Sequence, residues 1–392
     1  MTPLLTEPSE IFIYIIVLIG ALYWVGDQKF AASFFRYLPQ PIWIYFLPML
    51  SSYFGIIPHV SPFYDWVRNY LLPSGLVLML LSANLPGLAK LGPKALGIMA
   101  FATSGIIIGA TGTFALLHNS LPDEAWKGIA ALTGSWIGGS ANMVAVAKSV
   151  GTPDSMLGPI IVVDTVVGYG WMGVVIALSA YQVKFDKWNK VDTSLVTTLN
   201  KRMMEIDEQN RRHVTIKDLI FMLAIGFGVG FLTLKVGPML PPVGEVLNAF
   251  GWTVVLATIV GVLLSLTRLS ELEFAGASNV GSVLFYMLLA TIGAKADIAG
   301  ILDAPLFALA GVMIIATHAS MILLGGHLLK VPMFLMATSS QANIGGPVTA
   351  PIVAGIYQHS LAAVGLLLAV LGNVLGIFGG LFVAQLCYWI VS

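Results

Sequence analysis

Charged residues are scarce in this chain of 392 residues, and cysteine occurs once. Lys, Arg, Asp and Glu make up 10% of the sequence and hydrophobic residues 57%, whereas soluble domains are about 25% charged. Basic and acidic residues balance at 19 each, so no excess charge is available to attract nucleic acid. This composition excludes an ordinary soluble domain and predicts an all-α, polytopic protein embedded in a lipid bilayer.

Sequence motifs of common enzyme chemistry are also missing. No P-loop, HExxH, GxSxG or CxxC pattern occurs, so ATP hydrolysis and the common hydrolytic mechanisms lack their residues. The single cysteine, Cys387, can form no internal disulfide and is expected to serve packing. We therefore expect a protein that is not an enzyme and that needs no cofactor beyond a coupling ion.

Apolar runs long enough to cross a bilayer recur along the chain. We predict a first membrane repeat (1–183), a cytoplasmic connector (184–215) and a second repeat (216–392), with interrupted apolar segments at 124–150 and 332–358. The predicted crossings are residues 10–26, 41–57, 72–88, 95–117 and 154–182 in the first repeat, and 216–235, 249–267, 277–294, 303–329 and 360–391 in the second.

The two interrupted segments share a glycine pair. The first contains WIGGSANM around Gly138 and Gly139, and the second contains NIGGPVTA around Gly345 and Gly346. Glycine pairs disfavour helix, and irregular backbone at membrane depth is tolerated only in a cavity or within protein. Paired interruptions at matching positions of two halves are the best sequence indication of a transporter's binding site.

The distribution of Lys and Arg sets the predicted topology. The connector is rich in both and is therefore expected in the cytoplasm under the positive-inside rule. If the first interrupted segment is a re-entrant hairpin, then Lys29, Arg36, Lys90 and Lys94 are cytoplasmic too, whereas a full crossing moves them outside. We therefore predict two hairpins, a second half inverted relative to the first, and both termini outside the cell membrane.

The segments GSWIGGSANMVAVA and SSQANIGGPVTAPIVAGIY resemble those of bacterial membrane proteins of the domain of unknown function 819 group, over nearly the whole chain. That group looks like a distant relative of the cation/proton antiporter and anion transporter superfamily, whose broader kin include the sodium/glutamate and 2-hydroxycarboxylate symporters. The resemblance implies an elevator-type carrier with a scaffold part and a moving core, often a homodimer through the scaffold. It implies no particular substrate.

The hairpin tips are predicted to bind a transported small molecule. A tip exposes backbone N–H groups of one half-helix and carbonyls of the other, which suit an anion and a cation such as Na⁺ respectively. The alternative is that these small residues only let helices pack closely. The candidate substrate-binding residues are Ser135, Gly138, Gly139, Ser140 and Asn142 in the first segment, and Ser339, Ser340, Gln341, Asn343, Gly345, Gly346 and Thr349 in the second.

Asp164 is the main candidate for ion coupling. It lies about ten residues into its predicted crossing, near the bilayer centre, where an ionisable side chain by default marks an ion or substrate path. With Thr165 and Asn373 it forms an oxygen-rich set that suits Na⁺, and Asn142 and Asn343 are further predicted ligands. The same carboxylate could instead carry a proton, or form a structural hydrogen bond to a neighbouring helix.

Four other side chains each have two interpretations. His318 lies in mid-span and could titrate or simply pack. Trp136 lies beside the first tip and could stack on a substrate or serve packing. Glu271 and Glu273 fall near a predicted cytoplasmic edge of the membrane, and we expect them to be interfacial rather than functional.

The leading hypothesis is a secondary active transporter, a Na⁺-coupled symporter of a small anionic or zwitterionic organic solute. Because no Arg is expected within the membrane, an anionic group would rely on hairpin dipoles and hydroxyls. The alternative is a proton-coupled antiporter or exporter in which Asp164 shuttles H⁺. A sensor or an intramembrane enzyme would need a signalling domain or a nucleophile–base pair, and neither is visible. A channel fits paired hairpins less well than alternating access does.

Overall fold

The structure, a computed structural model, describes residues 3–29, 31, 34–35, 40–81, 91–191, 214–296, 304–357 and 361–392. Within these ranges the chain is helical, and its one β-feature is an isolated bridge between Val243 and Leu247. The predicted all-α class is confirmed. Helices are the expected outcome for such an apolar chain, because in lipid every backbone polar group must be satisfied within its own segment.

The helices of the first half are α1 (Pro8–Gly26), α3 (Gln40–Tyr53), α4 (Pro62–Trp66), η1 (Val67–Leu71), α5 (Leu72–Leu81), α7 (Pro93–Leu117), α8 (Ala125–Gly138), α9 (Ser140–Val150), α10 (Asp154–Leu178), η2 (Ser179–Tyr181) and α11 (Gln182–Trp188). Those of the second half are α13 (Ile216–Val236), η3 (Gly237–Met239), α14 (Ala249–Ser265), η4 (Arg268–Ala275), α15 (Ala277–Lys295), α16 (Ala304–Leu329), α17 (Met333–Ile344), α18 (Gly346–Tyr357) and α19 (Ala362–Val391).

In the described part of the chain, seven helices are long and apolar enough to cross a bilayer. They are α1, α7, α10, α13, α15, α16 and α19, and they coincide with seven of the predicted crossings. The protein is therefore a multi-pass membrane protein, as predicted.

The other three predicted crossings differ from the structure. Helix α14 has 17 residues, at the lower limit of spanning length, and the η4 segment that follows is bent from it by 95°. Helix α3 has 14 residues, fewer than the roughly 17–25 that a span requires. Helix α5 continues directly from η1. Residues 82–88 of its predicted crossing lie outside the described residues, as do Arg36, Lys90 and most of the connector.

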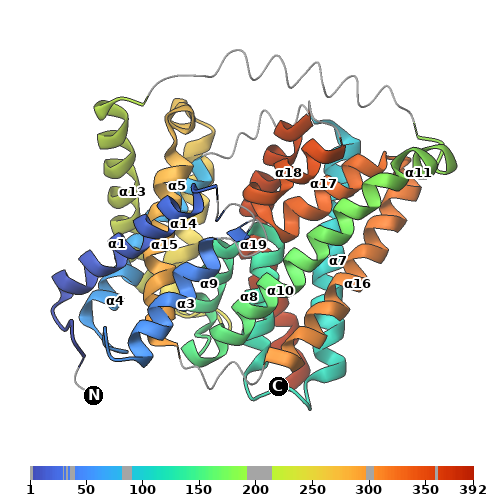
Figure 1. The fold of residues 1–392 in the computed structure, drawn as a ribbon. Helices are drawn as coiled ribbons and strands as arrows, with labels where there is room; N and C mark the ends of the chain where they lie inside the picture. The colour runs from blue at the N-terminus through green and yellow to red at the C-terminus, as the bar shows by residue number, and fades with distance from the viewer. Residues whose placement is uncertain are drawn as a thin grey trace.

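The helices form two bundles that lie side by side (Figure 1). In the first bundle, on the left of the view, α15 packs against α3 and α5, and α5 packs against α13 and α14; α1 and α4 complete it. The second bundle, which we call the hairpin bundle, contains α7 to α10 and α16 to α19, with α7 packed on α16 and α8 on α19. Both chain termini lie at the lower edge of this view.

Glycine allows the helices of the hairpin bundle to approach closely. A methyl group at Gly105 of α7 would lie 2.8 Å from the Cα of His318 on α16, and one at Gly109 would lie 2.9 Å from the Ile314 carbonyl oxygen. Neither distance is compatible with a side chain, since the nearest atoms belong to the backbone. Small residues at such contacts are the usual way to bring helices together in lipid.

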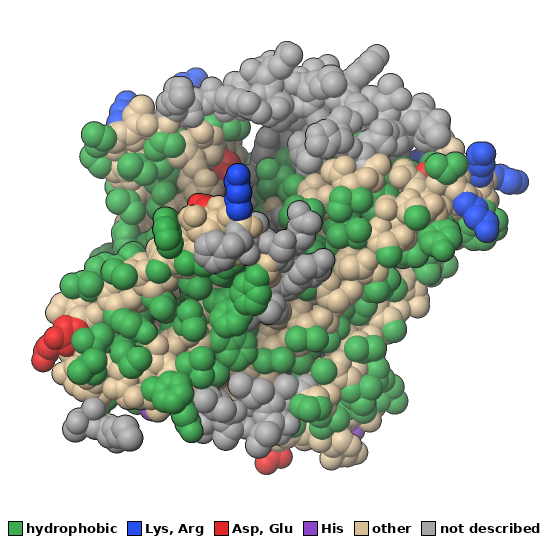
Figure 2. All heavy atoms as spheres, in the orientation of Figure 1, with side chains coloured by type: hydrophobic (Ala, Val, Ile, Leu, Met, Phe, Trp, Pro, Cys, Tyr) green, Lys and Arg blue, Asp and Glu red, His purple; other side chains and the backbone are tan. Residues whose placement is uncertain are grey.

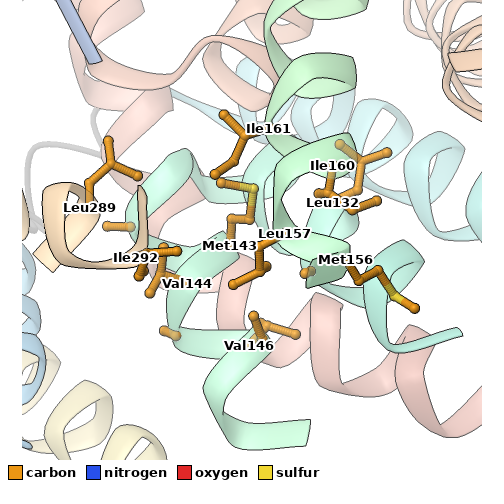
Figure 3. Packing of buried hydrophobic residues seen from close by; sticks show 14 of the residues in the cluster. Leu132, Met143, Val144, Val146, Met156, Leu157, Ile160, Ile161, Leu289 and Ile292 are labelled. Carbon is orange, nitrogen blue, oxygen red and sulfur yellow. The ribbon is translucent and has the colours of Figure 1, made fainter. Parts of the chain in front are cut away.

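The two bundles meet along α9, which packs against α14 of the other bundle, and Figure 3 shows side chains of α9 between those of α10 and α15. Leu289 and Ile292 of α15 lie beside Val144 of α9, and Met143 of α9 points toward Ile161 of α10. All five side chains are buried in one hydrophobic cluster. Apolar packing therefore joins the bundles at this level.

The outer surface is apolar over much of its extent. Figure 2 shows hydrophobic side chains on the flanks of both bundles, with Lys and Arg gathered at the end where α11 lies. Val166, Ile220 and Leu232 are each more than 60% exposed, at 63%, 61% and 61%. Large apolar surfaces of this kind are unfavourable in water and suit the hydrocarbon of a bilayer.

Candidate functional site

The first interrupted segment is a helical hairpin, α8–α9. Helix α8 ends at Gly138 and α9 begins at Ser140, and Gly139 between them has φ 86° and ψ 170°. This backbone conformation is nearly confined to glycine, which explains the residue at the tip. The hydroxyl of Thr152 after α9 donates to the Lys127 carbonyl oxygen at the start of α8 (3.4 Å). Both open ends of the hairpin therefore lie together.

The second interrupted segment is the hairpin α17–α18, in which Gly345 lies between the two helices and Gly346, the first residue of α18, has φ 62°. At its open end, the Met333 backbone N–H donates to the carboxylate of Asp186 on α11 (2.8 Å). The Tyr357 hydroxyl at the end of α18 donates to the carbonyl oxygen of Val175, near the end of α10 (2.6 Å). This hairpin therefore opens at the α11 end of α10.

The two hairpins open at opposite ends of α10, and their tips meet. Helix α10 has 25 residues, a length of roughly 37 Å at 1.5 Å per residue. Hairpin α8–α9 opens beside its first residues and hairpin α17–α18 beside its last (Figure 1). A methyl group at Gly346 would lie 3.7 Å from the Cα of Gly139. The glycine pairs of two distant segments are thus neighbours in the protein interior.

A cavity of about 170 Å³ lies at this meeting point, between the hairpin bundle and α5 and α15 of the first bundle. Nine of the predicted site residues line it: Gly138, Gly139, Ser140, Asp164, Thr165, Gln341, Gly345, Thr349 and Asn373. Four helix ends lie at this cavity: the N-termini of α9 and α18 and the C-termini of α8 and α17. Helix N-termini carry partial positive charge and C-termini partial negative charge.

Asp164 is the only acidic side chain among the described residues that line the cavity, and no Lys, Arg or His lines it with Asp164. Its carboxylate accepts a hydrogen bond from the hydroxyl of Ser135 on α8 (2.8 Å). It lies about ten residues into α10, about 15 Å along the helix and thus near its middle. A carboxylate at this depth without a cationic side chain can attract a cation or hold a proton.

Two further acceptors in the cavity are buried and unpaired. The side-chain oxygens Oε1 of Gln341 and Oδ1 of Asn373 have no hydrogen-bond partner, although both residues line the cavity. Gln341 is 1% exposed and Asn373 6%. A buried acceptor without a partner costs roughly 1–3 kcal/mol, so a donor or a cation that reached these oxygens would be favoured.

Six predicted site residues do not line the cavity: Ser135, Asn142, Ser339, Ser340, Asn343 and Gly346. Asn142 uses its amide group structurally, donating to the carbonyl oxygens of Gly138 (2.7 Å) and Asn373 (3.1 Å). Asn343 donates to the hydroxyl of Thr103 on α7 (3.2 Å). These amides connect the hairpins to α19 and α7, and the structure does not bring them to Asp164 as Na⁺ ligands.

Ser340 and His318 belong to a closed network away from the cavity. His318 Nδ1 lies 2.8 Å from the Ala102 carbonyl oxygen and must donate to it, since a carbonyl only accepts. Trp171 Nε1 donates to the Ser340 hydroxyl (2.8 Å), which in turn donates to His318 Nε2 (2.9 Å). Both imidazole nitrogens therefore have a partner, and the network links α7, α10, α16 and α17. The packing interpretation of His318 fits this geometry.

The structure also places the remaining candidates. Trp136 is fully buried against α10 and α16 and does not line the cavity. The carboxylate of Glu273 accepts from the backbone N–H (2.9 Å) and hydroxyl (2.6 Å) of Ser278 at the start of α15. Cys387 is buried. None of these contacts indicates a role in binding a solute or an ion.

Helices α15 and α5 also line the cavity, and no residue of either was predicted to do so. Ser282, Phe285, Tyr286 and Leu289 of α15 line the cavity. The signal for this face was present, because Ser282 and Tyr286 are four residues apart and therefore share one side of an apolar helix. Other lining residues that the prediction omitted are Met79, Ala141, Met143, Ile161, Gly168, Tyr169, Ile344 and Pro347.

Comparison with known proteins agrees with the glycine-pair resemblance. Residues 14–389 match the family described as "Protein of unknown function (DUF819)". The chain is 25% identical over 358 residues to the "Uncharacterized membrane protein YjcL" of Bacillus subtilis (strain 168), an alignment that covers 86% of this chain and 87% of that protein. Since the family match extends over nearly the whole length, including both hairpins and the cavity between them, this chain is a member of the DUF819 family of membrane proteins.

Proposed function

We propose that the protein is a secondary active transporter that carries a small organic solute together with a cation. The observation that supports this most strongly is the meeting of two oppositely oriented hairpin tips at a cavity with a single carboxylate at mid-depth. Discontinuous helices that end at a shared site near the bilayer midplane are the arrangement in which many secondary transporters bind substrate and coupling ion.

The arrangement of the bundles supports alternating access. The cavity is bounded on one side by the hairpin bundle and on the other by α5 and α15. Rigid movement of the hairpin bundle along α5, α14 and α15 would expose the same site to one side of the membrane and then to the other. This elevator-type movement fits two internally well-packed bundles joined along a narrower seam at α9.

Asp164 is the proposed coupling residue, with Ser135 and Thr165 as oxygen-bearing neighbours. Na⁺ is our preferred ion because neutral oxygens outnumber ionisable groups in the lining, and hard cations bind oxygen. The second candidate is coupling to H⁺, which requires only that the buried carboxylate of Asp164 gain and lose a proton.

Charge placement supports a cell-membrane orientation with the α11 end in the cytoplasm. Lys184, Lys187 and Lys190 lie in or directly after α11. At the opposite end, Lys127 is paired with Glu124, and Lys148 and Lys295 are paired with Asp154. An excess of Lys and Arg on one side is the signal that orients helical membrane proteins, and it would place both termini outside.

The test compares wild type with Asp164→Asn in two measurements: the melting temperature of the purified protein and solute uptake into proteoliposomes. If Na⁺ binds at this carboxylate, Na⁺ raises the melting temperature of wild type in proportion to the logarithm of its concentration. Asp164→Asn then loses that response while its fold persists. If H⁺ is the coupling ion, the pH dependence of uptake is lost in the variant instead. Wild type then shows no specific response of melting temperature or uptake to Na⁺. A variant that keeps every Na⁺ and pH response of wild type would contradict the coupling role.

A further inference from the structure

We propose that the solute bound in this cavity is a zwitterion with an apolar side chain, such as a neutral α-amino acid. Its ammonium group would lie at the free oxygens of Gln341 and Asn373, and its carboxylate at the first turn of α9. This proposal rests on the transport function proposed above and narrows the class of its substrate.

The two unpaired oxygens indicate a donor on the solute. Gln341 Oε1 and Asn373 Oδ1 come from different elements, hairpin α17–α18 and helix α19, yet both are buried, unpaired and in the lining of one cavity. Buried acceptors in folded proteins nearly always have a partner. An ammonium group supplies three N–H donors, enough for both oxygens.

Charge balance distinguishes a zwitterion from an anion. The described lining holds one carboxylate, Asp164, and no cationic side chain. With Na⁺ or H⁺ at Asp164 the site is neutral, and a zwitterion leaves it neutral. A carboxylate solute without an ammonium group would leave one net negative charge at low dielectric, which is costly without a cationic partner.

The carboxylate of the solute has a place at the tip of the first hairpin. Ser140 and Ala141 form the first turn of α9 and line the cavity. The first N–H groups of a helix have no partner within it and favour negative charge. The N-terminus therefore complements the acceptor pair contributed by Gln341 and Asn373.

The opposite wall indicates an apolar side chain. Met79 of α5 and Phe285 and Leu289 of α15 are three of the five residues that line the cavity from the first bundle; the other two, Ser282 and Tyr286, carry hydroxyls. A polar or charged side chain placed against the three apolar residues would lose hydration without gaining hydrogen bonds. An apolar side chain instead gains from burial.

The first experiment measures binding to the purified full-length protein in Na⁺ and in choline buffer. The probes are L-leucine, L-methionine and L-phenylalanine, each compared with its des-amino acid and with its amide. We expect at least one of these amino acids to bind, and its des-amino and amide analogues to bind at least tenfold more weakly, because each analogue leaves one group of the site unpaired. Equal or tighter binding of 4-methylpentanoate than of L-leucine would overturn the proposal, as would failure of all three amino acids to bind.

A matched pair of variants locates the ammonium site. Asn373→Leu removes the free oxygen at similar side-chain size and should weaken amino-acid binding at least tenfold, with less effect on the des-amino acid. Ser339→Ala is the control, because the Ser339 hydroxyl is equally buried and unpaired but does not line the cavity. Equal losses in both variants would contradict the assignment.

Failure of this inference is distinguishable from failure of the transport proposal. If no amino acid binds but Na⁺ or H⁺ still stabilises wild type and not Asp164→Asn, the carrier proposal stands and the solute class is wrong. If no ion response is found either, both fail.

Discussion

Lys295 at the end of α15 lies 3.4 Å, nitrogen to oxygen, from the carboxylate of Asp154 at the start of α10, and this ion pair joins the two bundles. Lys148 at the end of α9 binds the other oxygen of the same carboxylate (2.5 Å). Beside them, Asn248 of the first bundle donates to the backbone carbonyls of Lys148 (2.9 Å) and Ser149 (3.0 Å). If the hairpin bundle moves during transport, these contacts must break.

Removing the ion pairs of this junction should lower the stability of the protein, because they join the two bundles. We expect Lys148→Met to lower stability by about 1.5–3 kcal/mol, because it removes a hydrogen bond to a charged group. Lys295→Met should cost about 1 kcal/mol or less, since it leaves the pair of Asp154 with Lys148. Melting temperatures in detergent measure both effects, with exposed Lys184→Met as control. A larger loss for Lys295→Met than for Lys148→Met would contradict the geometry.

The tip glycine Gly139 should resist replacement for conformational rather than steric reasons. Its φ of 86° and ψ of 170° are nearly restricted to glycine, yet the nearest atom to an added methyl group is 3.7 Å away. Gly139→Ala should therefore cost about 1–3 kcal/mol. The control is Gly170→Ala, at an exposed helical site with open space, where alanine should be neutral or stabilising by up to about 1 kcal/mol. Similar melting temperatures for the two variants would show that the tip conformation is not strained by a side chain.

The His318 network should contribute to stability and not to ion coupling. His318→Leu leaves the Ser340 hydroxyl without its acceptor, and we expect a loss of about 1–3 kcal/mol. His318→Gln can replace part of the hydrogen bonding and should be less destabilised. Thermal unfolding with and without Na⁺ measures both quantities. Loss of the Na⁺ response in His318→Leu at unchanged stability would assign this residue a role in coupling.

The hairpin geometry predicts a labelling pattern in intact cells. In a Cys387→Ala background, cysteines at exposed Asp123 and Ser155, which flank hairpin α8–α9, should react with an impermeant maleimide from the same side. A cysteine at exposed Lys187 of α11 should react only after permeabilisation, because α10 separates the two ends. Reaction of Asp123→Cys and Ser155→Cys from opposite sides would mean that α8 and α9 cross the membrane together.

Two kinds of site residue differ in how well they could be predicted. Gly138, Gly139 and Asp164 stand out in the sequence, because glycine pairs and a carboxylate are unusual among apolar residues, and all three line the cavity. Asn142 and Asn343 stand out equally but hydrogen-bond to neighbouring helices. Sequence pattern reports that a polar group is within the membrane, and not which neighbour it faces.

The sequence by itself determined the membrane class, the helical elements and the two interruptions, because hydropathy, span length and glycine content act locally along the chain. Whether the two halves descend from an inverted duplication stays a prediction. Only the tertiary structure decided that the two glycine tips touch, that α15 supplies one wall of the cavity, and that the oxygens of Gln341 and Asn373 are left free. Those outcomes depend on how helices distant in sequence pack and on which hydrogen bonds that packing satisfies, which no local pattern records.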